Sequence, residues 1–137
     1  MTDIAYQAIL PEGWPRPRGF AHAVVASGTR SVRIAGQLGK QPGEAHVAEG
    51  LDLGAQWRLA MGNLVAVLKA AGGEPQHVVM LRAYVTDMAA FNRSGAAVGE
   101  AWGATLGRHF PAMTLVQVSG LVDPHAMVEI EGEAILP

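Results

Sequence analysis

Cysteine is absent from the 137-residue sequence. This absence excludes disulfide bonds, a thiolate metal site and a cysteine nucleophile. Long apolar runs are missing too, so no segment is predicted to span a membrane. Residues 1–6 lack the basic start and apolar core of a signal peptide, and the expected location is therefore the cytoplasm.

An excess of charge of one sign is lacking as well. The sequence has 10 basic and 12 acidic residues, which gives a formal net charge of −2. No basic stretch interleaves with aromatic residues, as it would on a surface that follows a phosphate backbone. Nucleic acid is therefore not an expected partner. Half of the residues are hydrophobic, so part of the apolar surface is expected to be shared between subunits.

The histidines do not form a metal-binding pattern. The chain has five of them, at His22, His46, His77, His109 and His125. No two have the i, i+4 spacing of a helical metal site or the i, i+2 spacing of a strand site, so no metal site is predicted. His22 follows a proline-rich loop, where functional residues often lie. A structural role and a ligand-binding role both remain open for this histidine.

The apolar pattern predicts one α+β domain over residues 1–137. Turn residues Ser27-Gly28-Thr29 predict that the second and third strands form a β-hairpin. Apolar and β-branched runs predict six strands, at Ile4–Ile9, Phe20–Ala26, Ser31–Ala35, His77–Thr86, Met113–Ser119 and Ala126–Leu136.

Two amphipathic helices are predicted between these strands. The first runs from Asp52 to Ala71, where apolar residues recur at helical spacing, and it ends at Gly72-Gly73. The second begins after Asp87, a residue that can cap a helix, and continues to Leu106. Two helices on one side leave the other sheet face bare, and we expect another subunit's sheet to cover it.

Three glycines recur in the second predicted helix. Gly95, Gly99 and Gly103 are four residues apart and therefore share one helix face. Because glycine has no side chain, this face is predicted to pack closely on the sheet.

A row of carboxylates marks the last predicted strand. Glu129, Glu131 and Glu133 are two residues apart, so they project from one face at intervals of about 6.6 Å. Such a row is often a solvated strand face. Partial burial would instead suit Glu129 to hold or deprotonate a water molecule, and both interpretations remain open.

The sequence resembles the RidA (YjgF) family of reactive-intermediate deaminases over nearly its whole length. The resemblance rests on six segments in order: Arg18-Gly19-Phe20-Ala21-His22-Ala23-Val24, Ile34-Ala35-Gly36-Gln37-Leu38-Gly39, Asn63-Leu64 through Leu68-Lys69-Ala70-Ala71-Gly72, Tyr84-Val85-Thr86-Asp87-Met88-Ala89-Ala90-Phe91, Pro111-Ala112-Met113-Thr114 and Val128-Glu129-Ile130-Glu131.

This resemblance implies a chorismate-mutase-like fold, with a six-stranded mixed sheet and two helices on one face. It implies a homotrimer whose sheets form a central barrel, with a small-molecule pocket at each subunit interface. Neither a cofactor nor a metal is implied. Family members hydrolyse imines and enamines such as 2-aminoacrylate to a keto acid and ammonia.

The family's site residues transfer to this chain only in part. The glutamate that positions water corresponds to Glu129, and the backbone glycine of the pocket to Gly36, which Gln37 follows. The pocket tyrosine corresponds to Phe20, and the arginine that binds the substrate carboxylate corresponds to Met113. A thioether cannot bind a carboxylate, so the substrate is expected to differ from 2-aminoacrylate.

Two functions follow as hypotheses. The first is a hydrolase of imines, enamines or related C=N compounds, with Glu129 as the catalytic residue and with Phe20, His22, Gly36, Gln37 and Met113 contacting the ligand. The second is a non-catalytic module that binds a small apolar metabolite. An RNA-cleaving activity is disfavoured by the net charge of −2.

Overall fold

The computed structural model describes residues 3–137, so the first two residues of the predicted domain lie outside it. The predicted α+β class and all six predicted strands are confirmed. The elements in chain order are β1 (Ala5–Ile9), β2 (Ala23–Ser27), β3 (Arg30–Leu38), α1 (Leu53–Ala70), the 3₁₀ turn η1 (Pro75–His77), β4 (Val78–Val85), α2 (Met88–Arg93), α3 (Gly95–Thr105), β5 (Ala112–Gln117) and β6 (Val128–Leu136).

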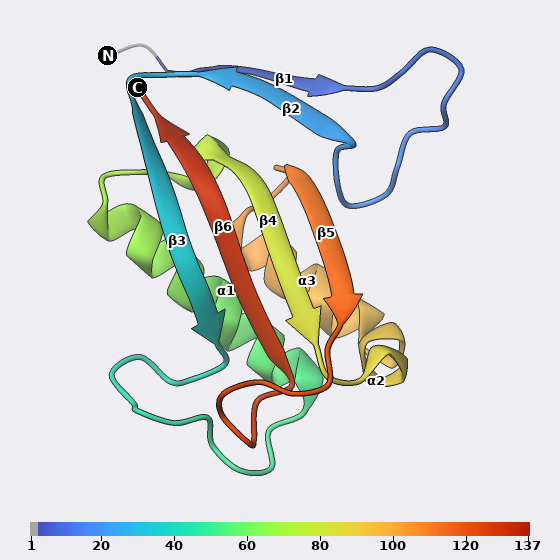
Figure 1. Ribbon diagram of the computed structural model, residues 1–137, viewed down its shortest axis with the longest axis vertical. Helices are drawn as coiled ribbons and strands as arrows, with labels where there is room; N and C mark the ends of the chain where they lie inside the picture. The colour runs from blue at the N-terminus through green and yellow to red at the C-terminus, as the bar shows by residue number, and fades with distance from the viewer. Residues whose placement is uncertain (1–2) are drawn as a thin grey trace.

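The six strands do not form the single sheet that was predicted. Four of them form a mixed sheet in the order β3-β6-β4-β5, in which β4 and β5 are parallel and the other pairs antiparallel. Strands β1 and β2 form a separate antiparallel ribbon. Figure 1 shows this ribbon across one end of the main sheet, with the helices behind that sheet.

The predicted hairpin of β2 and β3 is wrong, because the chain bends between them instead of folding back. The N–H of Thr29 donates to the carbonyl of Leu136 at 2.9 Å, and its hydroxyl donates to the carbonyl of Pro137 at 2.7 Å. A side chain at Gly28 would collide with the backbone of Leu136 and the side chain of Ile135. The C-terminal strand therefore fixes this corner, and β2 pairs with β1 while β3 pairs with β6.

Helix α1 matches its prediction closely. The side chain of Asp52 accepts a hydrogen bond from the N–H of Ala55 at 2.8 Å, which is the usual N-cap contact. Gly72, with φ at 92°, follows the C-cap and adopts the left-handed conformation that suits glycine. The face toward the sheet is buried, and its large side chains include Trp57, Met61, Leu64 and Leu68.

The second predicted helix is divided into α2 and α3. Asp87 caps α2 as predicted, with its side chain accepting from the N–H of Ala90 at 3.0 Å. The hydroxyl of Ser94 donates to the carbonyl of Ala90 at 2.7 Å, and Ser94 leaves helical geometry with ψ at 14°. This contact ends α2 before α3 begins at Gly95, so residues 3–137 contain three α-helices where two were predicted.

Strand β6 alternates strictly between the two faces of the main sheet. Val128, Ile130 and Ala134 are fully buried in the core formed with the helices. The intervening residues, Glu129, Glu131 and Glu133, lie on the opposite face and are half-buried. In Figure 1 no helix covers that face within residues 3–137.

Asp123 joins two loops at the end of the main sheet. Its carboxylate accepts hydrogen bonds from the N–H groups of Val47 and His125, each at 2.9 Å. These two bonds, first that of Val47 and then that of His125, lower the pKa of Asp123 below its ordinary value. Val47 itself is buried against Leu38 at the end of β3, so the contact helps to fix that strand end.

We expect the contribution of Asp123 to stability to depend on pH. A lowered pKa in the folded state stabilises the protein above the unfolded-state pKa, about 4, and this stabilisation is lost as the pH falls through the folded-state value. Urea midpoints should therefore favour the natural protein over Asp123→Asn at neutral pH, with the difference shrinking toward about pH 3. A difference that is constant with pH would contradict this role, because other acidic groups titrate equally in both proteins.

Candidate ligand site

Two of the three carboxylates on β6 are engaged by neighbouring side chains. The hydroxyl of Tyr84 donates to Glu131 at 2.5 Å, and this bond raises the pKa of Tyr84 above its ordinary value. Arg82 lies between the two glutamates, 3.5 Å from Glu131 and 3.8 Å from Glu133. Arg33 lies 3.6 Å from Glu133 on the other side. These contacts assign Glu131 and Glu133 to a partly exposed ion-pair network.

Glu129 differs from its two neighbours. Across residues 3–137 its carboxylate has no hydrogen bond and no ion pair. It lies directly against Gly36, since a Cβ on that glycine would overlap the Glu129 carboxylate. The half-buried carboxylate is therefore held close to a backbone segment but keeps its hydrogen-bonding capacity.

An irregularity in β3 brings the backbone of Gly36 to this position. The pairing of β3 with β6 shifts between Ile34 and Gln37, and neither Ala35 nor Gly36 is paired with a residue of β6. Such a bulge re-aims the strand locally. The side-chain amide of Gln37 donates to the carbonyl of Ala35 at 3.1 Å and so stays with its own strand. The structure thus brings together three predicted residues, Gly36, Gln37 and Glu129.

Met113 and Phe20 lie together at a second place, beside the edge strand β5. Both line a cavity of about 780 Å³ between α3, β5 and the loop that follows β1. Its wall is mostly apolar and also includes Trp102 and Phe110, whose rings stack at 5.9 Å. The volume lies within the range of small-molecule sites, roughly 300–1,000 Å³.

The glycines of α3 face this cavity and do not pack on the sheet as predicted. A Cβ at Gly95, Gly99 or Gly103 would meet no atom of the described chain within 4 Å, and all three residues line the cavity. The prediction was wrong because helical spacing shows which residues share a face but not what lies opposite that face. Glycine inside a helix costs about 1 kcal/mol relative to alanine, so this open wall lowers the stability of α3.

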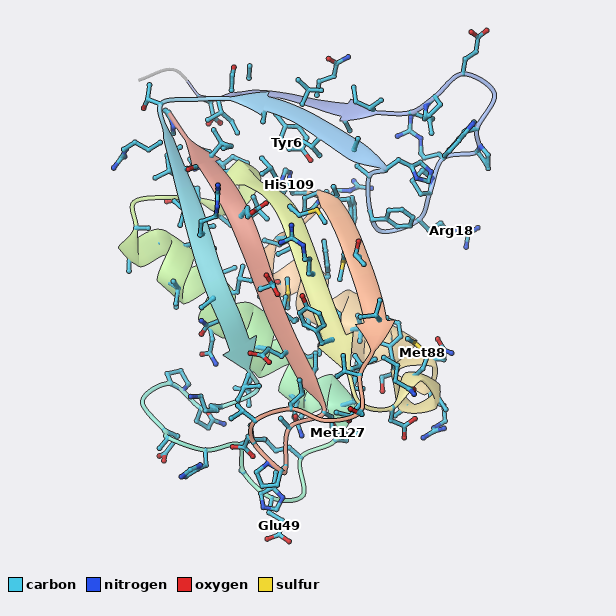
Figure 2. The ribbon with its side chains drawn as sticks, viewed as in Figure 1. Tyr6, Arg18, Glu49, Met88, His109 and Met127 are labelled. Carbon is cyan, nitrogen blue, oxygen red and sulfur yellow. The ribbon has the colours of Figure 1, made fainter. Side chains whose placement is uncertain are left out.

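His22 belongs to neither of these groups. Its ring is exposed and makes edge contacts with Trp14 at 5.0 Å and with Phe20 at 5.5 Å. It lines a different, more polar cavity of about 470 Å³ with Tyr6 and His109. Figure 2 shows Tyr6 and His109 side by side beneath the β1–β2 ribbon, where their rings are 5.0 Å apart.

Five of the six predicted site residues therefore form two separate groups within one chain, and His22 lines a neighbouring cavity that shares Phe20 with the α3–β5 cavity. The cavity that holds Met113 and Phe20 includes neither Gly36 nor Glu129. Sequence reasoning did not place Trp102 or the α3 glycines in a cavity wall, since the same apolar period describes a core helix.

Among residues 3–137 no group of three or more histidine, aspartate or glutamate side chains could hold a metal ion. Within the same range no helix has the length and hydropathy needed to cross a bilayer.

The fold and the cavity together place the protein in a structural class: a small α+β protein with a mixed sheet, helices on one face of that sheet and a cavity large enough for a small molecule. A family model described as Endoribonuclease L-PSP matches residues 15–136. Protein DfrA of Myxococcus xanthus is 32% identical over 136 residues, which is 98% of this chain and 99% of DfrA.

Two further relatives define the family more narrowly. The human 2-iminobutanoate/2-iminopropanoate deaminase is 30% identical over 116 residues, covering 85% of this chain and 79% of the human protein. The crystal structure of YyfB from Yersinia pestis, a protein of unknown function in the conserved Rid family, matches with a TM-score of 0.82 and 35% identity. That match covers 96% of this chain and 98% of YyfB. The chain belongs to the RidA (YjgF) family, as its sequence segments predicted.

Proposed function

We propose that this protein hydrolyses imines, enamines or related C=N compounds to a carbonyl compound and ammonia, with Glu129 positioning the water. The observation that carries the proposal is the free carboxylate of Glu129 beside Gly36, on a strand whose other two glutamates are paired. The imine deaminase activity in the name of the human relative supports the same reaction class.

The reaction needs one water molecule and a group that moves a proton. Glu129 would accept a proton from the water as its oxygen attacks the C=N carbon, which gives a carbinolamine. The protonated carboxyl then returns that proton to the nitrogen. Glu129 next takes the proton of the carbinolamine hydroxyl and passes it to the same nitrogen. The C–N bond then breaks, ammonia leaves and the oxygen stays on the carbon as a carbonyl, so that imine plus water gives carbonyl compound plus ammonia.

A complete site requires a second copy of the chain in this proposal. Glu129 and Gly36 lie on the uncovered face of the main sheet, whereas Met113 and Phe20 lie at the β5 side. A homotrimer whose sheets meet in a central barrel would bring Glu129 and Gly36 of one copy toward the cavity of a neighbouring copy. Light scattering at micromolar concentration should give the mass of three chains of 14.4 kDa. A monomer mass would contradict this assembly.

Ammonia release is the direct test of the reaction. Imines are generated freshly from a range of amino acids by an amino-acid oxidase, and their decay is followed with and without the protein. Acceleration across part of the panel is expected, with 2-aminoacrylate a poor substrate because its small apolar part leaves most of the cavity beside Phe20 and Met113 empty. No acceleration on any imine would overturn the proposal.

A non-catalytic binding module is the second candidate, and the apolar character of Met113 and Phe20 favours it. Such a module would bind small apolar metabolites in the α3–β5 cavity without any role for the carboxylate. Calorimetry separates the two functions: binding that survives Glu129→Ala but not Met113→Arg, in a protein without turnover, would support this candidate.

A further inference from the structure

The α3–β5 cavity is kept wide by residues that contribute no side chain to it. Gly95, Gly99 and Gly103 form one wall, and the space above each is empty within residues 3–137. The facing wall carries large apolar side chains, among them Phe110 and Met113. A space of about 780 Å³ bounded in this way has room for a ring or a branched chain, far more than the methyl group of a small imine needs.

Arg18 is the one charged residue in the described lining of this cavity. It lies on the proline-rich loop, and in Figure 2 this loop reaches the β5 side of the molecule. Arg18 is exposed and forms no ion pair within residues 3–137. A free guanidinium at the rim of an apolar cavity is suited to bind a carboxylate with its planar donors.

We propose that the ligand is a carboxylic acid with a large apolar group, which fills the cavity beside the α3 glycines while Arg18 binds the carboxylate. Arg18, on the proline-rich loop, would thereby bind the carboxylate that the uncharged Met113 on β5 cannot bind. This inference rests on the proposed function, for which it names the substrate class: imines of aromatic or branched α-keto acids. Their hydrolysis products are the corresponding keto acids.

Calorimetry on the whole chain with three commercially available compounds tests the substrate class. Phenylpyruvate has both features, pyruvate lacks the large group, and phenylacetone lacks the carboxylate. We expect phenylpyruvate to bind at least about 10-fold more tightly than either of the others, since each loses one of the two contacts. Equal affinities for phenylpyruvate and pyruvate would overturn the proposal.

Matched variants test the two contacts separately. Arg18→Gln should weaken phenylpyruvate binding by about 10- to 100-fold and leave phenylacetone unchanged. Arg16→Gln, two residues away on the same loop, is the control. Gly99→Leu should weaken phenylpyruvate by about 10-fold or more, because its side chain would enter the cavity. Gly62→Leu on the exposed side of α1 is the control, since a Cβ there also meets nothing within 4 Å.

Several outcomes would contradict these contacts. If Gly99→Leu dissociates the assembly, the glycine face is a subunit contact and the proposal fails. If that variant does not fold, Gly99→Ala, which favours the helix, replaces it and should still weaken binding. Glu129→Gln should retain phenylpyruvate binding. Loss of turnover therefore tests the proposed hydrolysis, whereas loss of phenylpyruvate binding tests the proposed substrate class. Hydrolysis of small imines without phenylpyruvate binding would overturn this inference and leave the proposed function standing.

Discussion

Glu129→Gln is expected to lower the rate of imine hydrolysis by about 10²- to 10⁴-fold, the usual contribution of a positioned acid or base. Glutamine keeps the size and shape of glutamate, so it should fit beside Gly36 as the natural residue does. It cannot accept the proton of the attacking water, however. The loss should therefore appear in kcat with little change in KM, as measured by ammonia release on the best imine of the panel.

Glu133→Gln provides the matched control for this experiment. Glu133 lies on the same face of the same strand, but it is paired with Arg33 and Arg82. Its replacement should change the rate less than about 3-fold, because a partly exposed ion pair contributes little to stability or to the site. Equal effects of the two variants, or an unchanged rate in Glu129→Gln, would show that the carboxylate beside Gly36 does not take part in the reaction.

Gln56→Leu should lower the free energy of unfolding by about 2–4 kcal/mol. The Gln56 side chain is 1% exposed and makes three hydrogen bonds. Its amide donates to the carbonyls of Leu51 at 3.1 Å and His125 at 2.9 Å. Its oxygen accepts from the N–H of Met127 at 2.7 Å. Leucine has a similar volume, so the change leaves these three backbone groups without their partner and creates little empty space.

Urea denaturation at neutral pH measures this effect, with Gln41→Leu as the control. Gln41 lies on an exposed loop, and its replacement should change stability by less than about 0.5 kcal/mol. A loss below about 1 kcal/mol for Gln56→Leu would mean that water replaces the amide at all three groups. The three hydrogen bonds of Gln56 would then contribute little to holding α1 against the loop before β6.

The helix α1 could be predicted from the sequence because its signals are local. Asp52 lies three residues before the N–H that it caps, and Gly72 lies directly after the last turn. The strands were also predicted, since their alternation or apolar content is visible in short windows. These features need no information about distant parts of the chain.

The arrangement of the strands could not be predicted in the same way. Ser27-Gly28-Thr29 is compatible with a tight turn, but the residues that decide its geometry are Leu136 and Pro137 at the other end of the chain. The same limit applied to α3. Its glycines share a face, yet only the position of β5 and of the proline-rich loop determines that this face borders a cavity.

The candidate site was predictable to a similar degree. Resemblance to a family indicated Gly36 and Glu129, and the register of β3 and β6 brings them into contact. The sequence places Arg16 and Arg18 on either side of Pro17 in the same loop but does not separate one from the other, because the position of Arg18 at the cavity rim depends on the path of the loop. The sequence also gave no sign that His22 would lie in a different cavity from Met113.

The contact of Gly36 with Glu129 links the evolution of two positions. The space that a side chain at residue 36 would need is already occupied by the carboxylate of residue 129. Relatives that acquire a side chain at the first position are therefore expected either to turn the carboxylate of the second away from this backbone segment or to replace the glutamate. In an alignment the two positions should covary, and the pair would separate hydrolytic members of the family from members that have kept the fold for binding alone.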